Sequence, residues 1–143
     1  MTDKITPYLL YEDVASMLDW LERAFGFRER LRFVADDGTV NHAEMELDGA
    51  SIFMGDPGGD FRSPRRGGYP GAQIHVYVDD VEAHFERAKA AGAEIRQEPT
   101  DQEYGDRRYD AKDPEGHLWS FAQRVRDVAP EEWGATVPEH AVS

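Results

Sequence analysis

Apolar and polar positions alternate along the first third of the chain with two different periods, which predict strands and a helix. Segment 5–11 is apolar and aromatic, as in a strand. A helix follows it, because apolar residues recur at helical spacing: Val14, Leu18, Leu21 and Phe25. Asp13 is placed as its N-cap and Gly26 as its C-cap. Three strands are then predicted at 28–35, 40–47 and 50–54, with Asp-Gly turns that are typical of hairpins.

The same pattern begins again after residue 71. A strand is predicted at 74–78 and a helix from Asp80-Val81 to 91–93. Residues 94–97 begin the next strand, and two further strands are predicted at 107–112 and 117–123. An offset of 67 residues places Tyr11-Glu12-Asp13-Val14 on Val78-Asp79-Asp80-Val81. One such unit leaves a sheet face uncovered, whereas two can share a sheet surface. We therefore predict an α+β fold: two βαβββ modules that form a curved mixed sheet around a concave pocket, with the helices outside.

This repeat divides the chain into four parts. Residues 1–56 are the first module, 57–71 a segment rich in glycine and proline, 72–125 the second module and 126–143 an acidic C-terminal tail. Two interpretations of 57–71 stay open: a lid over the pocket, or only the linker between the modules.

One turn, Asp113-Pro114-Glu115-Gly116-His117, stands directly before the last apolar segment. Together with the repeat, it resembles the vicinal-oxygen-chelate superfamily, which includes glyoxalase I, bleomycin-binding proteins, fosfomycin-modifying enzymes and extradiol dioxygenases. The stretch Tyr104-Gly105-Asp106-Arg107 is similar to a metal-poor, glyoxalase-like subgroup. The resemblance covers residues 5–124 and implies a two-module pocket, but this fold hosts both enzymes and pure binding proteins.

The resemblance also implies where a metal would be bound. Metal-using members take ligands from the first and last strands of each module, and the corresponding residues here are Thr6, Phe53, Gln73 and Ser120. Only Gln73 fits, because phenylalanine has no donor atom and hydroxyl groups are poor ligands for transition metals. An open catalytic site normally uses three protein ligands. We therefore expect no metal and no cofactor. A displaced site with His75 and Glu44 would need a different register.

Side-chain alternation predicts which residues line the pocket. Gln73, His75 and Tyr77 share one face of their strand, while its apolar positions lie under the helix. The same parity argument gives the full set of candidate ligand-binding residues: Tyr8, Phe53, Gln73, His75, Tyr77 and Ser120. His42, Glu44 and Glu46 share a face in the same way. The imidazole of His75 suits the role of a base or of a hydrogen-bond partner for a ligand. Alternatively, it has a structural role and only bonds a neighbouring carbonyl or carboxylate. The sequence identifies no catalytic residue.

Composition narrows the classes of partner. The 143 residues carry a net charge of −13, which disfavours binding to nucleic acid or to an anionic membrane surface. The absence of cysteine excludes disulfides and thiolate chemistry. We expect a cytoplasmic protein, because no apolar segment approaches the roughly 20 residues of a membrane helix and no signal sequence is evident.

Two functions remain as interpretations. The first is a metal-independent protein that binds a small organic molecule, such as an antibiotic or a toxic metabolite. The second is a metal-dependent lyase, isomerase or dioxygenase with a non-standard site, so the sequence does not decide whether the protein is an enzyme. By analogy with the superfamily, we expect a homodimer.

Overall fold

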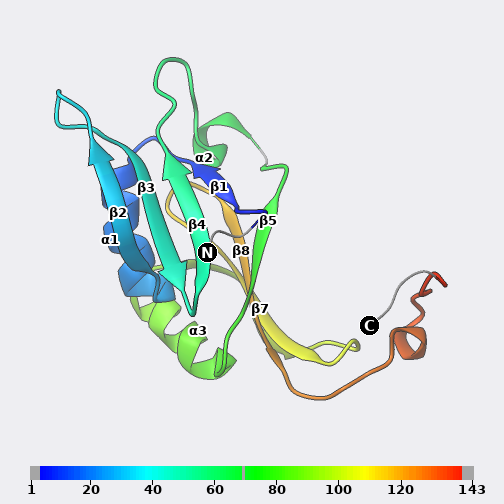
Figure 1. Cartoon of the computed structure of the whole chain (residues 1–143). Coiled ribbons are helices and arrows are strands. Elements are labelled where there is room, and N and C mark those ends of the chain that lie inside the picture. Colours follow the sequence, from blue (N-terminus) through cyan, green and yellow to red (C-terminus); the bar gives the residue numbers. More distant parts are fainter. Residues whose placement is uncertain (1–3, 69, 140–143) are drawn as a thin grey trace.

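The computed structural model describes residues 4–68 and 70–139 and confirms the two βαβββ modules (Figure 1). The first module contains β1 (Tyr8–Leu10), α1 (Val14–Phe25), β2 (Arg28–Val34), β3 (Val40–Leu47) and β4 (Ala50–Gly55). The second contains β5 (Gln73–Tyr77), α3 (Val81–Ala90), β6 (Glu94–Asp101), β7 (Asp106–Lys112) and β8 (Leu118–Arg124). A short helix, α2 (Pro64–Gly67), lies between the modules, and a 3₁₀ helix, η1 (Pro130–Trp133), lies in the tail.

Each module builds its own four-stranded mixed sheet. Sheet A has the strand order β1-β4-β3-β2, and sheet B has the equivalent order β5-β8-β7-β6. In both sheets the first strand pairs in parallel with the last, with Tyr8 opposite Phe53 and His75 opposite Ser120. The expected sheet is thus formed in two halves, whose corresponding edges are β1 and β5.

Two strands differ in length from the sequence prediction. β1 has only three residues, because pairing with β4 begins at Tyr8 and ends at Leu10. β6 continues to Asp101 through Pro99. Proline is tolerated there because β6 is an edge strand and its pairing with β7 shifts register between Gln97 and Thr100.

The two long helices begin in the same way, as the repeat predicted. The Asp13 carboxylate accepts a 3.0 Å bond from the backbone N–H of Ser16, and the Asp80 carboxylate accepts a 3.1 Å bond from that of Ala83. Each bond satisfies a backbone donor that the first turn of a helix leaves free. Gly26 ends α1 with φ of 85°, a left-handed conformation that glycine adopts without strain.

The core lies between the helices and the covered faces of the sheets. Largest among its fully buried side chains are Trp119, Tyr11, Tyr109, Phe25 and Phe121. Trp119 and Phe121 alternate with Ser120 along β8 and lie on its helix-facing side. Trp20 is 8% exposed and packs edge-on against Phe25, which places it at the margin of the core.

Side chains of α3 join the modules by capping the end of α1. The Arg87 guanidinium donates to the carbonyl oxygens of Glu22 and Arg23 at 2.8 and 2.9 Å. His84 Nε2 lies 2.9 Å from the carbonyl oxygen of Phe25. The last carbonyls of a helix lack partners in the following turn, and of these three only that of Glu22 also accepts a local bond, from the Gly26 N–H at 3.2 Å, so the second module completes the end of α1.

The Asp113–His117 turn makes a second joint between the modules. The Glu115 carboxylate accepts the backbone N–H groups of Glu12 and Asp13 at 2.6 and 2.9 Å, and His117 Nε2 bonds the Leu10 carbonyl oxygen at 2.8 Å. The loop before β5 is tied to the same joint, because the Arg65 N–H bonds the Glu115 carbonyl oxygen at 2.9 Å. Within the described ranges, no helix is long and apolar enough to cross a membrane.

Candidate functional site

Each sheet has one face under the helices and one face that no helix of the described residues covers. On β5 the exposed side chains are Gln73, His75 and Tyr77, while Ile74 and Val76 pack against the core. This alternation confirms the prediction that Gln73, His75 and Tyr77 share one face of β5 and that its apolar side chains lie on the other. We call the uncovered surfaces open face A, formed around Tyr8, His42, Glu44 and Phe53 of sheet A, and open face B, formed around Gln73, His75, Tyr77 and Ser120 of sheet B.

A chain of hydrogen bonds crosses open face A. The Tyr8 hydroxyl lies 2.8 Å from His42 Nδ1, and His42 Nε2 lies 3.1 Å from a carboxylate oxygen of Glu44. An ionised carboxylate only accepts hydrogen bonds, so the neutral tautomer of His42 that fits both contacts carries its proton on Nε2 and accepts the proton of Tyr8 at Nδ1. The pKa of Glu44 is lowered first by the bond from His42 and further by Arg30, which keeps this carboxylate charged.

The tyrosine reaches the histidine across a glycine. Gly55 lies opposite His42 in the sheet, and a Cβ at this position would be 2.8 Å from Tyr8 Cε1 and 2.9 Å from its hydroxyl oxygen. Phe53 contacts the other side of the pair, with its ring 5.9 Å from that of Tyr8 and 5.7 Å from that of His42. Arg30 holds the far end of the chain, with bonds of 3.3 Å to Glu44 and 3.0 Å to Ser51.

On open face B the imidazole of His75 and the buried hydroxyl of Ser120 belong to neighbouring positions of adjacent strands. Ser120 lies between His75 and Asp110 in the sheet register. Its Oγ is fully buried and has no hydrogen-bond partner among the described residues. Desolvation against the sheet lowers the pKa of His75, and the Arg108 charge lowers it further, while Asp106 and Asp110 oppose the shift. At neutral pH this face therefore presents an uncharged imidazole.

Ion pairs engage both arginines of β7, Arg108 on open face B and Arg107 on the opposite side, which faces α3. Arg108 pairs with Asp110 at 2.9 Å and donates to the Tyr104 hydroxyl at 3.2 Å. Tyr77 donates a 2.8 Å bond to the buried carboxylate of Asp106. Arg107 pairs with Glu82 and Asp101. Both arginines are therefore held by carboxylates of the protein itself.

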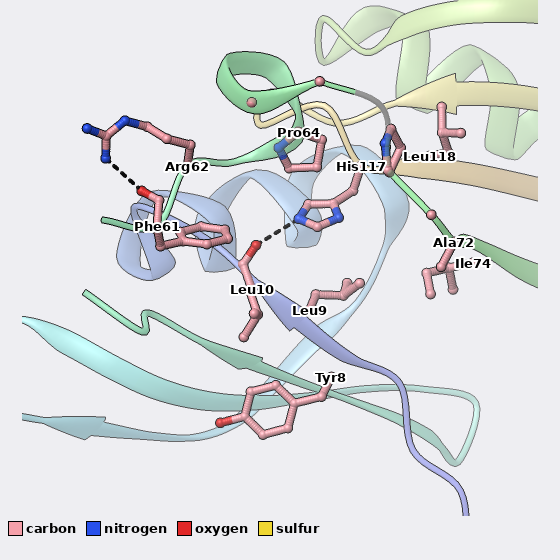
Figure 2. A pocket seen from close by; sticks show the side chains of 14 residues that line it. Tyr8, Leu9, Leu10, Phe61, Arg62, Pro64, Ala72, Ile74, His117 and Leu118 are labelled. Carbon is pink, nitrogen blue, oxygen red and sulfur yellow. Dashed lines mark hydrogen bonds between the residues drawn. The ribbon is translucent and has the colours of Figure 1, made fainter. Parts of the chain in front are cut away.

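Two cavities lie along the seam where β1 and β5 approach one another. One, of about 330 Å³, is lined by Tyr8, Leu10 and Ile74 together with Phe61 and His117 (Figure 2). In this view the Phe61 ring and the His117 imidazole lie on either side of Leu10, whose carbonyl accepts the His117 bond. The other cavity, of about 370 Å³, is lined by Phe27, Leu47, Ser51, His75 and Tyr77, among others. Each seam cavity therefore takes residues from both modules.

The sequence model of one family, the Glyoxalase/Bleomycin resistance protein/Dioxygenase superfamily, matches residues 4–121. The chain belongs to this superfamily. An uncharacterized protein of Mycobacterium bovis is 36% identical over 133 residues, covering 90% of this chain and 88% of its own. The crystal structure of TioX from Micromonospora sp. ML1 is similar with a TM-score of 0.72 and 38% identity, covering 87% of this chain and all of TioX. FosX from Mesorhizobium loti, with a TM-score of 0.62, 15% identity and coverage of 86% and 92%, shows the shared fold alone.

The metal positions of the superfamily do not fit a divalent ion in this chain. Phe53 offers no donor atom, and the buried hydroxyl of Ser120 is a poor ligand for a transition metal. Gln73 is the one good donor of the set, and it lies at the start of β5. Across residues 4–68 and 70–139, no group of three histidine, aspartate or glutamate side chains could hold a metal.

The six residues predicted from the sequence lie in two groups. Tyr8 and Phe53 belong to open face A, and the other four, Gln73, His75, Tyr77 and Ser120, belong to open face B. The main residue that the prediction omitted is His42, which bonds Tyr8. Its alternation with Glu44 was visible in the sequence, but its partner depends on the strand order: β4 lies between β1 and β3, and only Gly55 in β4 leaves room for Tyr8 to cross it.

Proposed function

We propose that this protein is a cytoplasmic homodimer that binds a small organic molecule without a metal ion, and that it sequesters an antibiotic or a toxic metabolite. The observation that carries the proposal is the exposure of large apolar side chains on both modules. Phe33 is 60% exposed, Tyr77 54%, Tyr8 51% and Leu31 44%. Apolar groups that cluster among polar ones are typical of ligand and subunit contacts.

A second copy of the chain would supply the missing wall of the pocket. Open face A has exposed aromatic and aliphatic side chains, and open face B has the uncharged imidazole of His75, whose neighbour across the strands is Ser120. When face A of one copy lies opposite face B of the other, a ligand between them contacts an apolar wall and a hydrogen-bonding wall. Most small-molecule sites combine these two features.

Titration with bleomycin, a cationic glycopeptide antibiotic, tests the antibiotic form of the proposal. Trp133 is 40% exposed and packs against Tyr104, which itself bonds Arg108 beside open face B, so its fluorescence reports on this surface. We expect saturable quenching at micromolar bleomycin. His75→Ala should weaken the binding about tenfold, because a central contact typically contributes more than 1 kcal/mol. Glu86→Ala on α3, on the helix side, is the matched control. No saturable change would reject bleomycin as the ligand.

Two further measurements test the remaining parts of the proposal. Elemental analysis of protein purified without chelator should show no stoichiometric zinc, nickel, manganese or iron, and an equivalent of any of them would favour the metal-dependent enzyme. Light scattering after size-exclusion chromatography should give the mass of a dimer. Phe33→Asp should shift that mass towards the monomer, because a charge at this position opposes burial of the face.

A further inference from the structure

The hydrogen-bond chain on open face A has the arrangement of an activated nucleophile. A hydroxyl lies within hydrogen-bond distance of an imidazole, which a third group orients from its other nitrogen. Arg30 and Ser51 fix this third group, the Glu44 carboxylate, so each of the bonds holds the next one in line. Ligand binding alone does not require such a chain.

We propose that Tyr8 is a nucleophile towards activated acyl esters, with His42 as its general base and Glu44 as the residue that positions the imidazole. The Tyr8 oxygen forms a bond to the acyl carbon while its proton passes to His42 Nδ1. The ester C–O bond then breaks, and the leaving alcohol departs as its anion. The protein retains an O-acyl tyrosine, and His42 releases its proton to water.

Access and geometry both favour this step. The Tyr8 side chain is half exposed, so an ester can reach its oxygen from the open side of the sheet. Phe53 lies edge-on to Tyr8 and offers an apolar contact for a flat aromatic leaving group. The inference shares this face with the proposed ligand pocket and rests on its being accessible to a small molecule, but it does not require a second copy of the chain.

Tyr77 is a matched control within the same chain. It is 54% exposed, against 51% for Tyr8, and its hydroxyl also donates a hydrogen bond. It donates to the carboxylate of Asp106, a far weaker base than an imidazole, and it accepts a 3.4 Å bond from Arg124. A difference in reactivity between the two tyrosines therefore reports the hydrogen-bond partners of each hydroxyl and not the exposure.

The probe is 4-nitrophenyl acetate, with peptide mass mapping to measure acetylation of each tyrosine. We expect Tyr8 to be acetylated at least about tenfold faster than Tyr77, because general-base catalysis commonly contributes a factor of 100 or more. In His42→Gln, which keeps a polar side chain but removes the base, the Tyr8 rate should fall to that of Tyr77. Glu44→Gln should lower the Tyr8 rate alone. Tyr8→Phe should abolish the 4-nitrophenolate burst.

Gly55→Ala tests the same geometry without altering any of the three hydrogen-bonded residues Tyr8, His42 and Glu44. Its added methyl group would overlap the Tyr8 ring, so the hydroxyl should leave His42 and the Tyr8 rate should fall. A melting curve establishes that each variant is folded. Equal acetylation of Tyr8 and Tyr77 in the native protein, or an unchanged ratio in both His42→Gln and Gly55→Ala, would overturn the inference.

The outcome is separable from that of the proposed function. Saturable bleomycin binding with no preference for Tyr8 would leave ligand binding in place and remove the nucleophile. Preferential acetylation of Tyr8 in a protein that does not bind bleomycin would support the nucleophile and reject that ligand.

Discussion

The Tyr11 phenol donates a 2.6 Å hydrogen bond to the Asp113 carboxylate, and this bond joins the two modules across 102 positions of sequence. Both residues are fully buried. Trp119 Nε1 donates to the same carboxylate oxygen at 3.0 Å, and the backbone N–H groups of Glu115 and His117 donate to the other oxygen. Asp113 therefore shapes its own turn and at the same time holds the junction between β1 and α1.

Tyr11→Phe should lower the free energy of unfolding by about 1–3 kcal/mol, because it takes one donor from a buried carboxylate. Urea denaturation followed by circular dichroism measures the change. Tyr104→Phe is the control, and it should change stability by less than about 0.5 kcal/mol because its hydroxyl lies nearer the surface. Equal effects of the two substitutions would contradict the importance of the buried bond.

Stability should also fall at alkaline pH. Burial, followed by the charge of Asp113, raises the pKa of Tyr11 well above its ordinary value of 10.0, and burial also raises the pKa of Tyr109. Above pH 10 the unfolded chain loses these protons while the folded chain keeps them, so the free energy of unfolding decreases as the pH rises. The decline measured from pH 9 to 11 should be less steep in Tyr11→Phe. An identical slope would exclude Tyr11 as a contributor.

A loss of stability is expected on mild acidification, through His84. Burial, with Arg87 as a further cause, lowers the pKa of His84, although the bond to the Phe25 carbonyl opposes the shift. Below about pH 6.5 the unfolded chain takes up a proton that folded His84 does not, so stability falls with falling pH. His84→Gln should be less stable at pH 8 but should vary less between pH 8 and 5.5. The pKa of His75 is also lowered, so His75 also makes the free energy of unfolding fall with falling pH. His75→Gln is therefore measured beside His84→Gln to separate the two contributions.

Gly116 should tolerate a side chain less well than a glycine of the same backbone conformation. Gly116 and Gly92 both have φ of 92°, but a Cβ at Gly116 would lie 2.6 Å from the Arg65 backbone nitrogen, whereas nothing lies within 4 Å of one at Gly92. Gly92→Ala should cost about 1 kcal/mol of backbone strain. Gly116→Ala should cost at least about 2 kcal/mol, because the loop that carries Arg65 must move. Thermal denaturation compares the two variants, and similar melting temperatures would contradict the tight contact.

Ser120→Ala should separate stability from ligand binding. The Ser120 hydroxyl is buried with no partner among the described residues, so its removal eliminates an uncompensated polar group. We expect the free energy of unfolding to stay equal or to rise by about 1 kcal/mol. Because Ser120 is 0% exposed, a ligand bonds this hydroxyl only where its binding displaces the side chains that cover it, and in that case affinity should fall in Ser120→Ala while stability does not. A destabilised variant would show that the hydroxyl has a partner in the folded protein.

The fold was largely predictable because its signals are local. The helical spacing from Val14 to Phe25, the Asp13 and Asp80 caps and the Asp-Gly turns each act within a few residues, and their recurrence identified two modules. The direction of Gln73, His75 and Tyr77 was also predictable, since alternation along a strand needs no knowledge of its neighbours. The lengths of β1 and β6 were less well predicted, because pairing with another strand sets where each one ends.

The sequence by itself thus determined two βαβββ modules, the caps of their helices and the faces on which the candidate residues lie, because short-range periodicity and capping control all three. Only the tertiary structure decided that Tyr8 crosses Gly55 to reach His42, and that Asp113 bonds Tyr11 in the other module. Both contacts depend on strand order and module packing. These join residues distant in sequence, and no local pattern contains that information.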